Sequence, residues 1–179
     1  NFRTPRIRIH LDGDFKEKGV ISADIFEVLN TPSLESYKHV LQFKHREAKK
    51  VYVYGLKTKS DDEVLQCLKD LVEIQLPADG LVMKRYHADG AGELIGKHIR
   101  NYLRNNKSTR TTKVTWTPRN TPEMNSILER ANRTLKEMAL ALILDSGLPS
   151  LFWFKAVQHA AYLINLLPTK TLKGYISPV

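Results

Sequence analysis

The sequence predicts an α/β fold in which a five-stranded mixed sheet carries helices on both faces. Short runs rich in β-branched and aromatic residues alternate with longer amphipathic runs along the 179 residues. Their order is three strands, helix, strand, helix, strand and two helices, which is typical of a layered α/β fold. No internal repeat and no low-complexity stretch interrupts this order, so we expect one domain.

The first three strands are predicted from short patterns. Residues 6–12 alternate strictly between apolar and polar side chains, which predicts a strand that ends at Asp12. Residues 13–36 are polar and irregular, and we expect a loop or a short hairpin there. Residues 37–45 and 49–57 are rich in aromatic and β-branched residues, and their short polar link favours an antiparallel pair.

The first helix has a clear start and end. Ser60 and Glu63 have the spacing of a capping box, in which Ser60 caps the helix and Glu63 bonds back to it. Apolar residues follow at helical spacing until Pro77 and Gly80, which end the pattern. Cys67 lies in this amphipathic run and is expected to be a buried structural thiol.

The second half alternates strands and helices. We expect a fourth strand over 81–89 that ends at Asp89, a helix within 90–106 and a fifth strand over 111–117. A loop with two Thr-Pro steps follows. A long helix is predicted over 123–146 and a last one over 150–167.

Three acidic residues fall at the ends or on the exposed faces of these elements. If the first and fourth predicted strands lie side by side, Asp12 and Asp89 meet near one edge of the sheet. On the long helix, Glu129 shares a polar stripe with Asn125, Arg133 and Lys136. The opposite, apolar stripe is expected to pack on the sheet and consists of Ile127, Ala131, Leu135, Met138 and Leu142.

Carboxylates gathered in this way can hold two divalent metal ions, which cut and rejoin phosphodiester bonds. The alternative interpretation of Glu129 is an ion pair with a neighbouring Arg on the helix surface.

The net charge of +9 is localised. Between Ile95 and Lys136 the chain has ten Lys and Arg residues against Glu123 and Glu129, a net charge of +8. A basic segment that overlaps two candidate metal ligands favours binding to a phosphate backbone. From this segment we add Arg130, Arg119 and Lys113 to the candidate DNA-binding residues.

Composition excludes several classes. A hydrophobic content of 42% with 26% charged residues is ordinary for a globular protein. No apolar run approaches the roughly 18 residues of a membrane span, and the amino terminus lacks a secretory signal. A single cysteine excludes an internal disulfide. The chain begins without Met, which suggests a piece of a longer protein, with a core over about 6–168 and tails at 1–5 and 169–179.

Five motifs in order resemble the catalytic core of retroviral-type integrases, in the copia-like branch of long-terminal-repeat retrotransposon polyproteins. They are residues 10–12 (HLD), 51–60 (VYVYGLKTKS), 85–94 (RYHADGAGEL), 117–135 (TPRNTPEMNSILERANRTL) and 147–153 (GLPSLFW). The matches spread over nearly the whole chain, and together they are much more specific than any one of them.

The resemblance implies a ribonuclease H-like fold and a polynucleotidyl transferase or endonuclease that trims element DNA ends and joins them to target DNA. Asp12, Asp89 and Glu129 would bind two Mg²⁺ (or Mn²⁺) ions. Asn125, Arg133 and Lys136 would contact DNA beside the metals. The family also implies a homo-oligomer, a dimer or higher, that acts in the nucleus or in a retroelement particle. Its zinc-binding amino-terminal domain and DNA-binding carboxy-terminal domain would lie outside this chain.

Departures from the family pattern leave alternatives open. The family follows its first Asp with Gly-Pro, whereas Asp12 is followed by Gly13 and Asp14, so Asp14 is an alternative first ligand. Changes at 13, 91, 124 and 126 raise the alternative of a catalytically decayed module that binds DNA or supports assembly. A nuclease of the same fold that cuts RNA in hybrids is a third hypothesis. Residues 151–153 are either an oligomer interface or part of the core.

Overall fold

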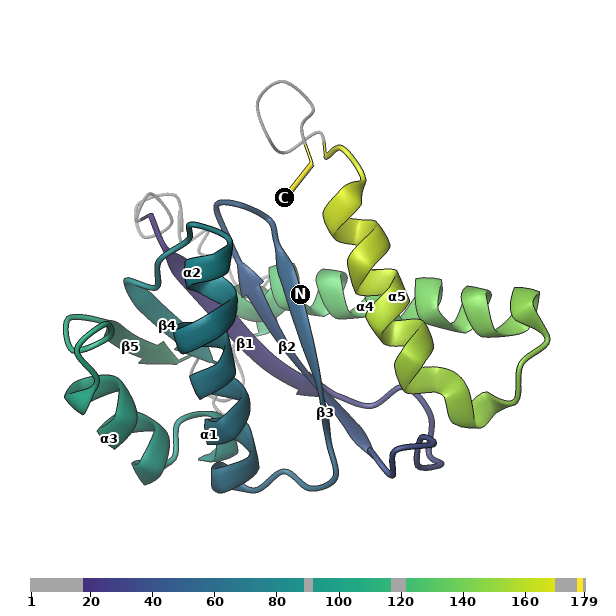
Figure 1. The fold of residues 1–179 in the computed structure, drawn as a ribbon, viewed down its shortest axis with the longest axis horizontal. Coiled ribbons are helices and arrows are strands. Elements are labelled where there is room, and N and C mark those ends of the chain that lie inside the picture. Colours follow the sequence, from purple (N-terminus) through teal and green to yellow (C-terminus); the bar gives the residue numbers. More distant parts are fainter. Residues whose placement is uncertain (1–17, 89–91, 117–121, 170–176, 179) are drawn as a thin grey trace, which may run out of the picture.

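The computed structural model describes residues 18–88, 92–116, 122–169 and 177–178, and within 122–127 it describes the backbone alone. A single sheet forms its centre, with strands in the order β3-β2-β1-β4-β5 (Figure 1). The strands are β1 (Val20–Phe26), β2 (His39–His45), β3 (Val51–Leu56), β4 (Arg85–Ala88) and β5 (Lys113–Trp116).

The sheet is mixed, as predicted. The pairs β1–β2 and β2–β3 are antiparallel, and β1–β4 and β4–β5 are parallel. Helices flank both faces (Figure 1): α1 (Asp61–Asp70), α2 (Leu76–Ala78), α3 (Lys97–Asn105), α4 (Pro122–Ser146) and α5 (Trp153–Leu166). The α/β fold and five strands predicted from the sequence are therefore confirmed.

The prediction of a loop or short hairpin over residues 13–36 is wrong. The strand that pairs in parallel with β4 is β1, which lies within the 13–36 stretch expected to be a loop. In the described sheet the two neighbours of β4 are β1 and β5. Residues 6–12, with Asp12, and also Asp14, lie outside the described residues.

The physical reason is the central position of β1. Val20, Ile21, Ser22 and Ala23 are all buried, so both faces of this half of the strand are covered. A strand covered on both faces loses the period-two pattern that identifies a half-exposed strand. The regular alternation of residues 6–12 was therefore a misleading signal for the centre of the sheet.

The remaining predicted elements are confirmed, most with shorter bounds, whereas α4 begins one residue earlier than predicted, at Pro122. The first helix begins as predicted at Ser60, whose hydroxyl accepts a hydrogen bond from Glu63 N at 3.3 Å. The return half of the capping box is different, because the Glu63 carboxylate accepts from the backbone of Lys57 and Thr58 at 2.7 and 2.8 Å. After α1 the chain continues as a π-helical turn (Leu71–Gln75) into α2.

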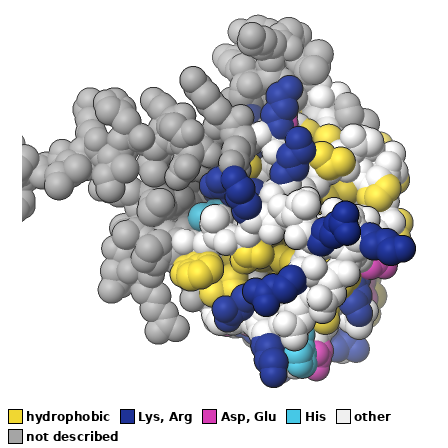
Figure 2. Space-filling view, turned by 90° about the vertical axis from the view of Figure 1, so that its left-hand side faces the viewer, with side chains coloured by type: hydrophobic (Ala, Val, Ile, Leu, Met, Phe, Trp, Pro, Cys, Tyr) yellow, Lys and Arg dark blue, Asp and Glu magenta, His cyan; other side chains and the backbone are white. Residues whose placement is uncertain are grey.

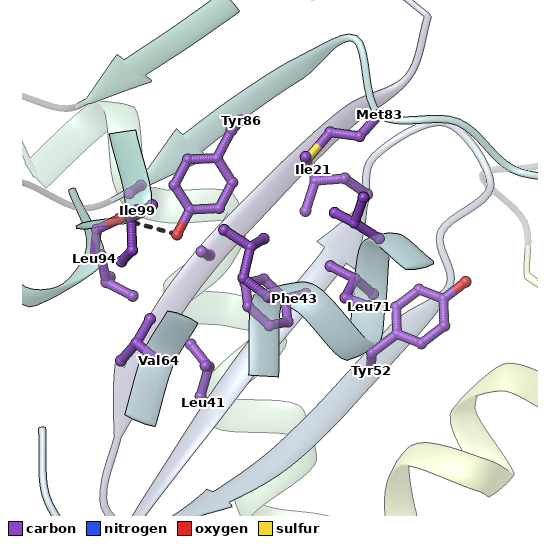
Figure 3. Close-up of a cluster of buried hydrophobic side chains, with 14 of the residues drawn as sticks. Ile21, Leu41, Phe43, Tyr52, Val64, Leu71, Met83, Tyr86, Leu94 and Ile99 are labelled. Atoms are coloured by element: carbon purple, nitrogen blue, oxygen red, sulfur yellow. Dashed lines mark hydrogen bonds between the residues drawn. The ribbon is translucent and has the colours of Figure 1, made fainter. Parts of the chain in front are cut away.

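One core lies between the sheet and α1, α2 and α3. Tyr86 is buried in it and donates its hydroxyl to the Leu94 carbonyl at 3.0 Å (Figure 3). Ile21 from β1 and Phe43 from β2 point into the same cluster. Cys67 packs against it but is half-buried, whereas the sequence predicted a buried thiol, and burial raises the pKa of its thiol to about 12.

A second core joins the opposite face of the sheet to α4 and α5. Trp153 is fully buried there and donates its indole N–H to the Thr31 carbonyl at 3.0 Å. Leu151 is 37% exposed, so within residues 151–153 the tryptophan belongs to the core. Of the predicted apolar stripe on the long helix, Leu135, Met138 and Leu142 pack in this core, together with Ala139. None of the helices that the structure describes is long and apolar enough to span a membrane.

A side-chain amide attaches α5 to the edge of the sheet. Asn165 accepts from Val51 N and donates to Val51 O, each at 2.8 Å. The amide thus pairs with the backbone of β3 as a neighbouring strand would, and it satisfies two polar groups at a half-buried position.

We predict that Asn165→Ala lowers the free energy of unfolding by about 1–3 kcal/mol, because it leaves both backbone groups of Val51 unpaired. Urea denaturation measures the loss. Gln158→Ala, at an exposed position of the same helix, is the control and should change stability by less than about 0.5 kcal/mol. Equal effects of the two substitutions would contradict the role of Asn165.

Candidate functional site

Asp24 lies on the face of the sheet that α4 covers. Ile21 and Ala23 point into the core under α1, and successive side chains of a strand alternate between faces. Ser22 and Asp24 therefore point to the opposite face, toward α4. Asp24 is half-buried, and its Oδ1 accepts a hydrogen bond from Ile25 N at 2.8 Å.

A side-chain hydrogen bond joins Asp24 to α4. Asn132 donates from Nδ2 to Asp24 Oδ2 at 2.5 Å. Glu129 precedes Asn132 by three residues, and residues three apart lie on one side of a helix. The Glu129 carboxylate, which is exposed, therefore lies one turn along α4 from the contact with Asp24.

The register of β1 and β4 shows which paired residues come directly before Asp24 and Asp89 in the chain. Ala23 pairs with Ala88, so the residues that follow them are Asp24 on β1 and Asp89 after β4. Neighbouring strands are about 4.8 Å apart. Asp89 itself lies outside the described residues, and no group of three metal-binding side chains occurs within the part of the chain that the structure describes.

The described donors suit a hard divalent cation. Asp24 and Glu129 supply carboxylate oxygens, which Mg²⁺ prefers. Beside them, Oδ1 of Asn132 is buried and has no hydrogen-bond partner among the described residues. A buried acceptor without a donor is costly, and the water of a hydrated cation would satisfy it. The residues present therefore fit a hydrated Mg²⁺.

Several cations lie on the same sheet face as Asp24. Arg46, from the turn after β2, donates its Nε–H to the Ser22 hydroxyl. Burial and the nearby Arg85 guanidinium lower the pKa of Arg46 to about 10. Lys113 pairs in register with Arg85, and His87 hydrogen-bonds Thr115 at 3.0 Å, so the polar face continues across β4 and β5.

The candidate DNA-binding residues fall into three groups. Arg133 and Lys136 lie on the Glu129 side of α4, as predicted, and Lys113 lies on the same sheet face as Asp24. Arg130 lies on the other side of α4, where it lines a separate cavity. Arg119 and the side chain of Asn125 lie outside what the structure describes.

The basic segment forms an exposed surface. Figure 2 shows Lys and Arg side chains across the face formed by α3 and β5, with little acidic surface. These exposed cations come from α3 and the turn that follows it: Lys97, Arg100, Arg104, Lys107 and Arg110. The surface provides the charge that a polyanion needs.

Known proteins share this fold. The catalytic core of the BIV integrase aligns with a TM-score of 0.63 and 15% identity over 90% of this chain and 91% of that chain. The HTLV-2 integrase catalytic core, solved in complex with magnesium in a trimeric form, aligns with a TM-score of 0.64 and 13% identity over 90% and 93% of the two chains. The fold therefore defines a ribonuclease H-like domain of the integrase catalytic-core type.

The sequence comparison specifies the relationship further. A retrovirus-related Pol polyprotein of the transposon TNT 1-94 from Nicotiana tabacum is 30% identical over 153 residues, 86% of this chain and 11% of that protein. No family model matches. The chain is thus related to the integrase-core-like region of copia- and Ty1-type retrotransposon Pol polyproteins. It spans about a tenth of the length of the curated relatives that it matches first.

Asp24 is a candidate site residue that sequence reasoning missed. Its run, Val20–Phe26, contains a single carboxylate among mostly apolar residues. A lone charged residue inside a short apolar run is rarely buried without a partner or a function. The sequence contains that signal. The alternating run that ends at Asp12 nevertheless favoured Asp12 as the first metal ligand.

We predict that Asp24 and Asn132 are energetically coupled, because a hydrogen bond to a charged group contributes about 1.5–3 kcal/mol. A double-mutant cycle with Asp24→Ala and Asn132→Ala, followed by urea denaturation, measures the coupling. The matched cycle of Asp24→Ala with Asn105→Ala, an exposed residue of α3, should give less than about 0.5 kcal/mol. A coupling energy near zero in the first cycle would contradict the packing of α4 against β1.

Proposed function

We propose that the chain is the catalytic core of a metal-dependent polynucleotidyl transferase that trims the DNA ends of a retroelement and joins them to target DNA. The observation that carries this proposal is the hydrogen bond between Asp24 and Asn132, because it brings the Glu129 side of α4 to the strand beside β4. The magnesium bound by the HTLV-2 core of the same fold supports it.

The proposed ligands of two Mg²⁺ or Mn²⁺ ions are Asp24, Asp89 and Glu129. Asp24 takes the place that the sequence suggested for Asp12 or Asp14, because β1 is the parallel neighbour of β4. The parallel register, in which both aspartates directly follow the paired Ala23 and Ala88, supports a shared site for Asp24 and Asp89.

The chain's own residues would position the reacting groups. Asn132 orients the Asp24 carboxylate through its amide N–H, and Arg133 and Lys136 would hold DNA phosphates on the Glu129 side of α4. The bound ions would supply activation of the attacking oxygen and stabilisation of the leaving 3′ oxygen. Phosphate contacts of this kind position the substrate and read little sequence.

The basic surface of α3 would extend the contact with DNA. Assembly into a homo-oligomer is part of the proposal, and the trimeric form of the HTLV-2 core supports it. Action on retroelement DNA would take place in the nucleus or in a retroelement particle. The core over 6–168, with flanking zinc and DNA-binding domains in the parent polyprotein, stays a prediction.

We predict that Glu129→Gln and Asp24→Asn each reduce Mn²⁺-dependent cleavage and joining of an element-end duplex by at least about 10³-fold. Each removes a charged ligand and leaves the side-chain shape nearly unchanged. The assay measures both products with the parent polyprotein's integrase region, so that any missing domains are present. Asp12→Asn and Asp14→Asn are the matched controls and should retain activity.

The controls distinguish the candidate first ligands. Loss of activity in Asp12→Asn, with Asp24→Asn active, would overturn the assignment of Asp24. Full activity of Glu129→Gln would overturn the whole site. An inactive parent that still binds DNA in a salt-dependent way would identify a decayed DNA-binding module instead.

A further inference from the structure

A cavity with two cationic side chains in an otherwise largely apolar lining lies on the other side of α4 from Glu129. It has a volume of about 200 Å³ and is lined by Lys44, Val51, Arg130, Ala131, Thr134, Leu135 and Ile164. A water molecule occupies about 30 Å³ in the liquid, so the cavity has room for a phosphate group and a few waters. Its floor is β2 and β3, and its walls are α4 and α5.

Lys44 is the unusual group in this cavity. It pairs in register with Ser22 on the α4 face of β2, where it is half-buried. No hydrogen bond or ion pair joins its ammonium to any residue that the structure describes. A half-buried charge without a partner is unfavourable, and a ligand of opposite charge would relieve it.

Other cations lie close to Lys44 and add to the positive electrostatic potential there. Burial and the nearby Lys49, Arg130 and Arg46 all lower the pKa of Lys44. Glu47, the acid on the turn after β2, is exposed, and the neighbouring charges that act on Lys44 are all cations. The cavity therefore concentrates positive charge from β2, its turn and α4.

The α4 wall adds directional groups. Arg130 and Thr134 are four residues apart and so lie on one side of the helix. The Thr134 hydroxyl donates to the Arg130 backbone carbonyl at 3.0 Å, which fixes the orientation of the hydroxyl. No hydrogen bond or ion pair joins the exposed Arg130 guanidinium to a residue that the structure describes. Arg130 is not one of the proposed metal ligands, although it directly follows Glu129 in the chain.

We propose that this cavity is an oxyanion site that takes a phosphate group, held by Lys44 and Arg130. A guanidinium and an ammonium that converge on one cavity suit a tetrahedral oxyanion. The group can come from a DNA backbone phosphodiester or from free phosphate. Only the DNA source depends on the proposed function. A duplex has a phosphate every ~3.4 Å per strand, and α4 is about 10 Å wide, so one DNA can reach both sides of the helix.

The first test uses inorganic phosphate and the 179-residue chain at low ionic strength, without divalent metal. We expect saturable shifts of the Val51, Ala131 and Thr134 amide signals in ¹H–¹⁵N spectra. Lys44→Met and Arg130→Gln should each weaken this binding at least about tenfold. Lys38→Met, an exposed lysine just before the other end of β2, should leave it unchanged.

The outcome is decisive for the site. Lys44→Met replaces a half-buried ammonium with an apolar chain of similar length, and Arg130→Gln changes an exposed position, so both variants should fold. Unchanged phosphate binding in both, or shifts confined to α3, would overturn the proposal. Equal binding of acetate would also overturn it, because the site would then select carboxylates.

The second test identifies the source. For duplex DNA, the logarithm of the association constant decreases linearly with the logarithm of salt concentration. The magnitude of this slope should decrease by about 1 in Lys44→Met and in Arg130→Gln, and stay unchanged in Lys38→Met. An unchanged slope, with phosphate binding lost, would support the site and assign it to free phosphate. These measurements need no metal and no catalysis, so their failure is distinct from inactivity of Glu129→Gln or Asp24→Asn.

Discussion

The parallel pairing of β1 with β4 is the constraint on which the rest of the structure depends. It places two strands at the centre of the sheet with Ala23 opposite Ala88, and the chain continues from each alanine into an aspartate. The apolar face of these strands covers the core under α1, so their polar side chains face α4. The hydrogen bond from Asn132 to Asp24 then fixes how α4 lies on that face.

The α4 face of the sheet is costly for stability. Gln42, which pairs in register with Asp24, is 0% exposed, and neither of its amide atoms has a hydrogen-bond partner among the described residues. Lys44 and Arg46 add half-buried positive charge a few residues further along. Each unsatisfied buried group costs about 1–3 kcal/mol. The two hydrophobic cores must offset that cost, and polar groups retained at such a cost are typical of a functional face.

The basic residues on and around α4 lie in separate groups. Arg133 and Lys136 lie on the side of Glu129, whereas Arg130 turns toward Lys44. Helical spacing alone separates these groups, because one residue turns the helix by about 100°. The charge on α3 forms a third, exposed surface (Figure 2). A single net charge of +9 therefore corresponds to at least three local environments.

The sequence by itself determined the fold class, the antiparallel pair β2–β3, the long helix with Glu129 and the basic segment. Each depends on local periodicity or composition, which a single chain displays directly. Only the tertiary structure decided that Val20–Phe26 is the central strand and that Asp24 is the carboxylate beside β4. A strand covered on both faces shows no alternation of apolar and polar residues, so its sequence does not identify it as a strand. Its neighbours in the sheet are determined by residues far away in the chain. The same reason applies to Arg130 and Lys44, which are 86 positions apart in the chain and meet only because α4 packs on β2.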